Sequence, residues 1–334
     1  MAKYKTIKGF TIQSLASDPP TTAEGQIWYN TTSETFKAMV TSGTWASGPA
    51  FPVNVSSTAG CGTTTAAVSA GGNPQLTVSA EWDGSSWTTN PGMNTGRYGL
   101  AVFGIQTAAV GVGGDANPGD RYITNTETYN GSTWTAGTAY PIALSVGGGF
   151  GTDAAGVVVG GTTTPSFALT NVTNNYASGT WTASGTQATT SRVGGSVGTQ
   201  TAGMYMAGYT GPDENTSRIT TTQTYDGSTW TNSPISVNNA SNGVGSCGTQ
   251  GLALMWGGRF NSPPNPTNIM NFTESFDGSS WSASGTLNVA RAYPGRAGTT
   301  NTSALAWGGN PGPAAPDVTE TFSMSGVVET ITTS

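Results

Sequence analysis

The stretch "TETYNGSTWT" at residues 126–135 returns as "TQTYDGSTWT" at 222–231 and as "TESFDGSSWS" at 273–282. Asn-Gly or Asp-Gly between β-forming residues is the strongest short-range signal for a tight hairpin turn. Asn or Asp followed by Gly accepts the positive φ angles that such a turn requires. Each copy therefore predicts a strand, a tight turn and a second strand that carries the tryptophan.

The closing tryptophan recurs along the chain at intervals of 42 to 51 residues. It is found at Trp45, Trp87, Trp134, Trp181, Trp230 and Trp281. Between these positions a second phrase recurs, an apolar strand that ends in a glycine pair, as in "GTTTAAVSAGG" at 62–72 and "GTQGLALMWGG" at 248–258. A period of this size indicates a propeller or another repeat array. We therefore expect an all-β fold in which each repeat supplies four strands.

The repeat resembles a known pattern. A hydrophobic strand ending in Gly-Gly, then an aromatic residue and a Trp, over about fifty residues, is similar to the kelch repeat of β-propellers. The six copies imply a six-bladed kelch-like propeller over residues 45–334, with the six tryptophans at equivalent structural positions. The turn is shorter than in kelch repeats, since Trp230 follows Tyr225 by only five residues. Two segments compete for the outer strand of the last blade: the strand of Trp45 and residues 327–333.

Composition narrows the function classes. The chain has 334 residues, of which 8% are charged, and its net charge of −6 argues against nucleic acid as a partner. Histidine is absent, so the commonest metal ligand and general base is missing. We expect no cofactor, no membrane insertion and no secretory signal. Cys61 and Cys247 occupy matching places in different repeats and are predicted to be buried and unpaired.

Residues 1–44 form a different part, predicted as an extended N-terminal arm and a β-hairpin. All four lysines lie within the first 37 residues. The stretch "IQSLASDPPTTAEGQIWYNTTSETFKAMV" at 12–40 resembles the opening of bacteriophage fibre and virion proteins, and its combination with short kelch-like repeats resembles structural proteins of marine phages. The resemblance implies a virion protein, assembled in the host cytoplasm in several copies or as a homo-oligomer. It would attach to other virion proteins through residues 1–40. The attachment residues that we expect are Lys3, Tyr4, Lys5, Ile7, Lys8 and Phe10.

Ligand binding is predicted on one face of the propeller. In a four-stranded blade, the loops after the second strand and before the first share one face, and here they vary in length, charge and aromatic content. A varied face on a regular scaffold is the one that recognises partners. The candidate binding residues on this face are Arg97, Arg192, Arg291, Asp115, Arg121, Asp213, Glu214, Arg259 and Phe260.

Catalysis and metal binding are less favoured interpretations. Arg97, Arg192 and Arg291 each follow a tryptophan by ten or eleven residues, and an arginine triad on a propeller axis is how sialidases hold a carboxylate. We interpret the three instead as one repeated structural position. The acidic loops at 115–120 and 211–217 lack the spacing of a dedicated calcium site. We therefore predict no metal and no enzyme.

Three functions remain open at this stage. The first is adhesion or host recognition, with a host surface glycan or protein as the partner. The second is architecture alone, as a head-decoration or tail-capping protein. The third is a glycan-active enzyme.

Overall fold

A computed structural model of the chain describes residues 12–20, 25–116, 121–164, 168–211, 216–260, 269–310 and 317–331. These residues form strands, turns and loops, without a helix. In the part of the chain so described, there is accordingly no helix long and apolar enough to cross a membrane. Two compact units are present: residues 1–44 with 324–334, and residues 45–323. Residues 324–334 thus group with the N-terminal segment, whereas the sequence predicted that they belong to the repeats.

The first unit contains a small sheet. Its strands are β1 (Gln13–Leu15), β2 (Ile27–Asn30) and the first part of β3 (Thr35–Gly48). β1 pairs with β2 in parallel, and β2 pairs with β3 as an antiparallel hairpin. Trp28 is fully buried, and its Nε1 donates a hydrogen bond to Asp18 Oδ1 at 3.0 Å. The same carboxylate oxygen accepts from the Asn30 amide, so one aspartate connects the loop to the hairpin.

The second unit is built from antiparallel sheets of four strands. Five of them are made entirely within residues 59–283: β4 (Ala59–Gly62), β5 (Ala67–Ala70), β6 (Ser79–Trp82) and β7 (Trp87–Asn90); β8 (Ala101–Ile105), β9 (Ala108–Val112), β10 (Thr126–Tyr129) and β11 (Trp134–Ala136); β13 (Gly148–Gly151), β14 (Ala155–Val159), β17 (Thr173–Ala177) and β18 (Thr180–Ser184); β19 (Gly195–Thr199), β20 (Ala202–Met206), β21 (Thr222–Tyr225) and β22 (Trp230–Asn232); β24 (Gly245–Gly248), β25 (Ala253–Trp256), β27 (Thr273–Phe276) and β28 (Trp281–Ala283).

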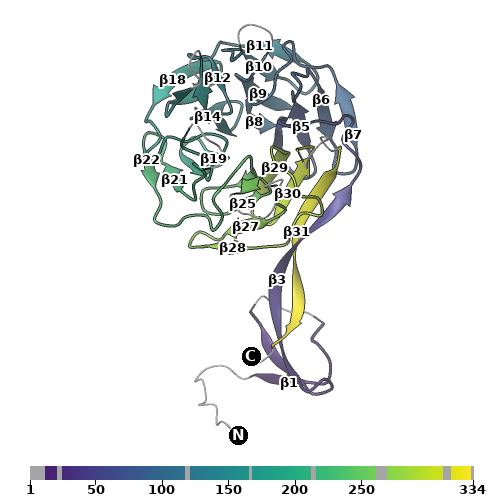
Figure 1. The fold of residues 1–334 in the computed structure, drawn as a ribbon. Coiled ribbons are helices and arrows are strands. Elements are labelled where there is room, and N and C mark those ends of the chain that lie inside the picture. The colour runs from purple at the N-terminus through teal and green to yellow at the C-terminus, as the bar shows by residue number, and fades with distance from the viewer. Residues whose placement is uncertain are drawn as a thin grey trace. The chain divides into compact units, whose positions relative to one another are not determined.

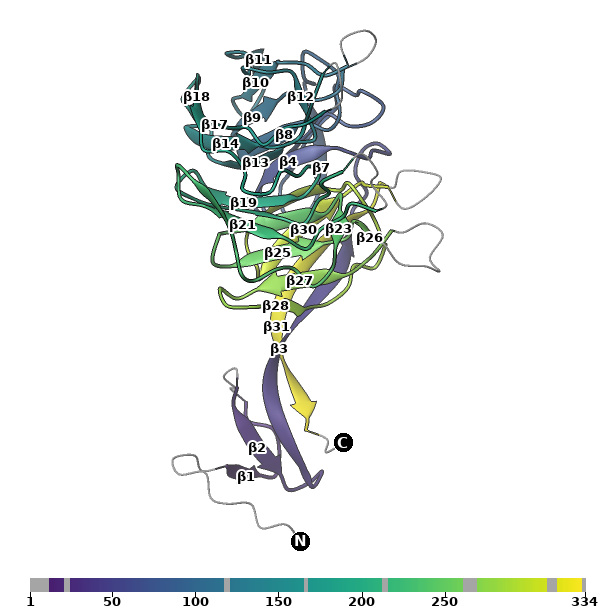
Figure 2. The ribbon, with the colours of Figure 1, turned by 60° about the vertical axis from the view of Figure 1, so that its left-hand side comes forward.

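The remaining strands complete the unit. In the last sheet, β29 (Gly295–Thr300), β30 (Ser303–Trp307) and β31 (Thr319–Thr330) are followed by β3. Short strands pair in the loops: β12 (Leu144–Ser145), β15 (Thr162–Thr163) and β16 (Ala168–Leu169) in one group, β23 (Ser241–Asn242) and β26 (Arg259–Phe260) in another. Figure 2 shows β23 and β26 at one face of the second unit.

The sheets of the second unit surround a common axis. Within each sheet the strands follow one another from the centre to the rim, as β8, β9, β10 and β11 do in Figure 1. The innermost strand of each sheet lies beside the innermost strand of the next, and β29 lies beside β4. The ring of inner strands is therefore closed.

A ring of backbone hydrogen bonds connects the sheets around the axis. Just before each inner strand, one residue has a φ between 52° and 65°: Ser57, Gly99, Val146, Val193, Gly243 and Tyr293. The N–H of each donates to the carbonyl oxygen of its counterpart in the preceding sheet, over 2.7 to 3.3 Å. The bond from Ser57 N to Tyr293 O, at 3.0 Å, closes the circle. Four of these six residues are not glycine, so the left-handed backbone is imposed by the ring.

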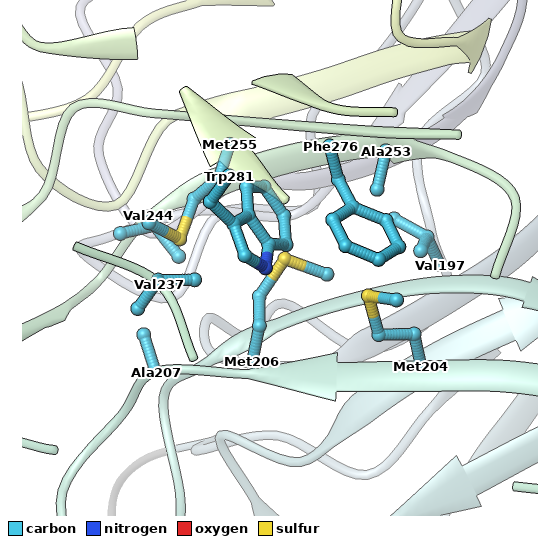
Figure 3. Packing of buried hydrophobic residues seen from close by; sticks show 10 residues of the cluster. All are labelled: Val197, Met204, Met206, Ala207, Val237, Val244, Ala253, Met255, Phe276 and Trp281. Carbon is cyan, nitrogen blue, oxygen red and sulfur yellow. The ribbon is translucent and has the colours of Figure 1, made fainter. Parts of the chain in front are cut away.

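The repeated tryptophans pack between neighbouring sheets. Trp281 of one sheet lies against Met206 of the sheet before it, and Phe276, beside Trp281, lies over Met204 (Figure 3). Trp134 packs in the same way and donates a hydrogen bond from Nε1 to Ser79 Oγ at 3.0 Å. Each tryptophan thus contributes apolar area to an interface that no single sheet could bury alone.

The first and last strands of the repeat region meet in the last sheet. Its outer strand is the segment of β3 that carries Trp45, next to β31. Of the two segments that competed for this place, the Trp45 strand holds it, while residues 327–330 prolong β31. The two cysteines, Cys61 and Cys247, are buried and unpaired, as predicted.

Candidate functional site

A cavity of about 410 Å³ lies on the axis of the second unit, and residues at the entry of each inner strand of the ring line it. The cavity opens on the face that carries the varied loops. These loops lead into the first strand of each sheet or follow its second strand. The side chains that give it chemical character are Tyr98, Asp115, Arg121, Tyr122, Arg192, Tyr209, Tyr293 and Arg296. Arginines and tyrosines therefore supply most of the charged and aromatic groups of its wall.

One side of the cavity is organised around Asp115. This carboxylate is buried and accepts a hydrogen bond from the Tyr98 hydroxyl at 3.0 Å. Arg121 Nε lies 3.1 Å from the same oxygen, with 57% of its side chain exposed. Burial, together with the hydrogen bond to Asp115, raises the pKa of Tyr98. The phenol thus stays protonated as a donor at neutral pH.

Arg192 lies in another part of the wall, at the entry to β19. Its Nη1 donates a hydrogen bond to Thr162 Oγ1 at 2.5 Å, and its Cζ stands 4.5 Å from the centre of the Tyr209 ring. Its buried Nε has no hydrogen-bond partner among the described residues. None of these contacts neutralises the guanidinium, which leaves it available to an anionic ligand.

Arg296 lies deeper, on the inner strand β29. It lines this cavity and also a second one of about 280 Å³ at the other end of the axis. Its Nη1 and Nη2 donate to Ser246 Oγ and Ser196 Oγ, each at 2.9 Å. Burial lowers the pKa of Arg296, although an arginine remains protonated at neutral pH.

Two of the predicted binding arginines are not in the cavity. Arg97 and Arg291 are fully buried, and each pairs with a carboxylate of the same sheet, Glu127 at 3.2 Å and Glu320 in very close contact. Burial lowers the pKa of Arg97 to about 10 while Glu127 opposes that shift. These two residues fasten the loop before the first strand to the third strand, so they are structural.

The interpretation of the three arginines as one repeated position was wrong for Arg192. The residue equivalent to Arg97 and Arg291 in that sheet is Ser191, and Arg192 is the next residue along the chain. At the position of Glu127, this sheet has Gln223, whose Oε1 accepts from Thr189 N at 2.9 Å. A shift of one residue thus moves the side chain from the interior of a sheet to the wall of the cavity.

The other predicted residues have varied places. Asp115 and Arg121 lie in the cavity wall, as described. Arg259 stands beside it, with its Cζ 5.3 Å from the centre of the Tyr293 ring, and Phe260 is half-buried. Asp213 and Glu214 lie outside the described residues, as do the predicted attachment residues, which are Lys3, Tyr4, Lys5, Ile7, Lys8 and Phe10.

The sequence reasoning missed Arg296 and the tyrosines of the cavity. An alignment of the inner strands would have revealed Arg296, because the equivalent residues are small or apolar: Gly60, Val102, Gly149, Ser196 and Ser246. Tyr122 comes from a loop of variable length, in which no repeat position marks it. Tyr293 stands at the repeat position of Ser57 and Gly99, and Tyr209 at that of Asp115, where the residue type changes from sheet to sheet. Within the described ranges, no group of three Cys, Asp or Glu side chains could hold a metal ion.

Comparisons with known proteins support the architecture. No protein-family profile and no curated protein sequence matches the chain. Among solved structures, the β-propeller-like protein YjhT aligns with a TM-score of 0.67 and 16% sequence identity, over 81% of this chain and 95% of YjhT. At this identity the likeness concerns the fold alone. The ring of four-stranded antiparallel sheets is that of a β-propeller.

Proposed function

We propose that the protein is a non-enzymatic bacteriophage virion protein, a six-bladed kelch-like propeller that binds a host surface glycan in its axial cavity. One observation carries the binding part of this proposal. The cavity lies on the varied face and combines cationic side chains with aromatic ones. A volume of about 410 Å³ is within the usual range for small-ligand sites.

A carbohydrate suits this wall better than an apolar ligand does. Tyrosine rings present an apolar face together with a polar hydroxyl, which matches the mixed surface of a sugar ring. Arginines supply several fixed N–H donors for hydroxyl and acidic groups. Weak contacts of this kind become effective when a particle displays many copies of the protein.

The virion location rests on the resemblance of residues 12–40 and on the surface of the first unit. Seven large apolar side chains are exposed in the described part of the chain, and five of them belong to that small unit: Ile12, Ile27, Phe36, Val328 and Ile331. Exposed apolar side chains gathered in this way are typical of surfaces that contact other proteins. We therefore assign attachment to the particle to the first unit.

Binding of the purified full chain to a glycan array tests the proposal. We expect a restricted set of glycans to bind, and Arg192→Ala to reduce their signal by at least tenfold. Asp226→Asn is the matched control, because Asp226 lies in an exposed turn between the third and fourth strands of the same sheet that Arg192 precedes. Equal binding by wild type and Arg192→Ala would contradict a cavity site, and no binding at all would favour a purely architectural protein.

Immunogold electron microscopy of phage particles tests the location. Label on the tail or on its fibres supports host recognition. Label on the head favours the decoration role instead, and absence from purified particles contradicts the virion assignment.

A further inference from the structure

Arg296 is the one long side chain in a ring of short ones. At the equivalent level of the other inner strands stand Gly60, Val102, Gly149, Ser196 and Ser246. All six positions line the second axial cavity. Because the neighbours are mostly glycine and serine, the guanidinium has room to extend across the channel.

The contacts of Arg296 place its guanidinium between the two cavities. It reaches Ser246 of the adjacent sheet and Ser196 of the sheet after that, which only a group extended across the channel could do. Both hydroxyls also donate their protons to backbone carbonyls, Ser196 to Gly149 O at 3.1 Å and Ser246 to Ser196 O at 3.3 Å. The two serines therefore hold the guanidinium as neutral acceptors.

The positive charge of Arg296 has no carboxylate to balance it among the described residues. Among the described residues of the two cavity walls, Asp115 is the only acidic one, and it is paired with Arg121. Arg192 likewise has a hydroxyl and an aromatic ring as its partners. Arg192 and Arg296 thus both line the axial cavities without a carboxylate partner among the described residues, in a protein whose net charge is −6. Two further arginines, Arg97 and Arg291, do have buried carboxylate partners, so this fold pairs its buried cations elsewhere.

A partly buried cation that keeps only neutral partners is costly unless an anion joins it. A guanidinium has five N–H donors arranged for planar oxyanions, and the protein uses one on each of Nη1 and Nη2. We infer that the axial channel is an oxyanion site in which Arg296 is the counter-ion of a carboxylate or sulfate group that enters through the cavity of Arg192. This inference rests on the proposed glycan-binding function and narrows its ligands to acidic saccharides.

The rest of the wall fits a ligand of this class. An acidic group at Arg296 would leave the attached sugar ring in the wider cavity, where the tyrosines lie. The first-strand positions nearest to Arg296 on the varied side are small, as at Ala59 and Ala101, so they leave the passage open. Arg192 then provides the second cation along the same path.

Isothermal titration of the full chain with small probes tests the site. The probes are glucuronate, glucose 6-sulfate, inorganic sulfate and neutral glucose. We expect the three anions to bind, with affinities that fall as sodium chloride is raised, and glucose to bind at least tenfold more weakly than glucuronate. Arg296→Met should weaken glucuronate binding about 10- to 100-fold, the usual loss for a hydrogen bond to a charged group. Arg296→Lys should retain part of the affinity, and Lys37→Met, which removes a cation from the first unit, should change nothing.

A second measurement covers the case in which Arg296→Met fails to fold. In the wild-type chain, NMR signals of the arginine side chains should then report sulfate directly, with the Nε–H resonance of Arg296 shifting on addition. Equal affinity for glucose and glucuronate, an Arg296→Met variant that binds glucuronate like wild type, or an unmoved Arg296 resonance would each overturn the inference. Neutral glycans that bind the array independently of Arg296 would refute the oxyanion site and leave the adhesion function intact. If the anions bind through Arg296 but no glycan on the array binds, the oxyanion site would stand and the adhesion function would be refuted.

Discussion

Trp45 Nε1 donates a hydrogen bond to Thr273 Oγ1 at 2.9 Å, although 228 residues separate them in the chain. The same bond joins Trp87 to Thr319, Trp134 to Ser79 and Trp230 to Thr173. In each pair a tryptophan on the outer strand of one sheet contacts the start of the third strand of the preceding sheet. Trp45 therefore functions as a repeat tryptophan, even though it comes from the other end of the chain.

Replacing Trp45 by alanine should lower the free energy of unfolding by about 3–5 kcal/mol, the usual loss for a large buried aromatic residue. Trp45 is 7% exposed and packs against Trp256 and Phe322. Trp181→Ala is the matched control, because Trp181 is half-buried and its Nε1 donates to the carbonyl oxygen of Thr138, which follows β11, rather than to the start of a third strand. Urea unfolding of the two variants should show the larger loss for Trp45. A loss below about 1 kcal/mol there would mean that the N-terminal strand is not needed to close the ring.

The four-stranded repeat could be predicted from the sequence, but the strand that closes the ring of sheets could not. The spacing of the tryptophans and the glycine pairs predicted the four-stranded unit because both features recur at fixed positions of every sheet. The choice between Trp45 and residues 327–333 stayed open, because both segments are β-forming and only their pairing distinguishes them. The pairing depends on contacts across the whole length of the chain, which no local pattern encodes.

The buried pair of Arg97 and Glu127 gives a prediction on stability. Arg97→Ser should cost about 3–5 kcal/mol, because it leaves Glu127 buried without its counter-ion. The double variant Arg97→Ser, Glu127→Gln should recover most of this loss, since it copies the arrangement of Ser191 and Gln223 in another sheet of the same molecule. Thermal or urea unfolding measures both. If the double variant is no more stable than the single one, the pair does not act as a unit.

The same pair provides a test against a binding role for Arg97. The Arg97→Ser, Glu127→Gln variant should bind glycans as the wild type does, because Arg97 is fully buried. If the double variant is folded and stable but does not bind glycans, Arg97 contributes to binding after all.

The exposed turns predict a dependence on pH. Backbone hydrogen bonds from Ser279 and Ser280 to Asp277 Oδ1, at 2.8 Å each, favour the ionised carboxylate and lower its pKa to about 2. Since the unfolded pKa is about 3.9, the stabilisation is complete above that pH and is lost as the pH falls toward 2. An NMR titration of the Asp277 carboxyl should give a midpoint near 2, and a midpoint near 4 would contradict the turn geometry.

Asn130 supplies the natural control for this turn. Its Oδ1 accepts the corresponding bonds from Ser132 N and Thr133 N at 3.0 and 2.9 Å without a titrating group. Asp277→Asn should therefore keep the turn and remove its contribution to the pH dependence below pH 4. A variant that loses the turn instead would show that the charge is required.

The attachment segment gives a prediction on assembly. Deletion of residues 1–26 should leave the repeat unit folded, because the described inter-sheet contacts of that unit lie within residues 45–323. The truncated chain should fail to enter phage particles. Circular dichroism and particle blots measure the two properties, and normal incorporation of the truncated chain would place the anchor elsewhere.

The candidate site was harder to predict from the sequence than the fold. The varied loops indicated the face on which the cavity opens and gave Asp115, Arg121 and Arg192, which line it. Arg97 and Arg291 follow their tryptophans by ten residues and Arg192 by eleven, and this difference of one residue decides whether the side chain enters a sheet or the cavity. Arg296 lies within a regular strand, where a charged residue among small ones was the available signal.

A crystal structure of the full chain with the glycan that binds most tightly on the array would locate the binding site directly. A site in the axial cavity predicts a bound glycan there, with a sugar ring beside Tyr209 and an acidic group in contact with Arg192 or Arg296. A glycan bound at the face of the Asp-Gly turns, or at the first unit, would contradict it.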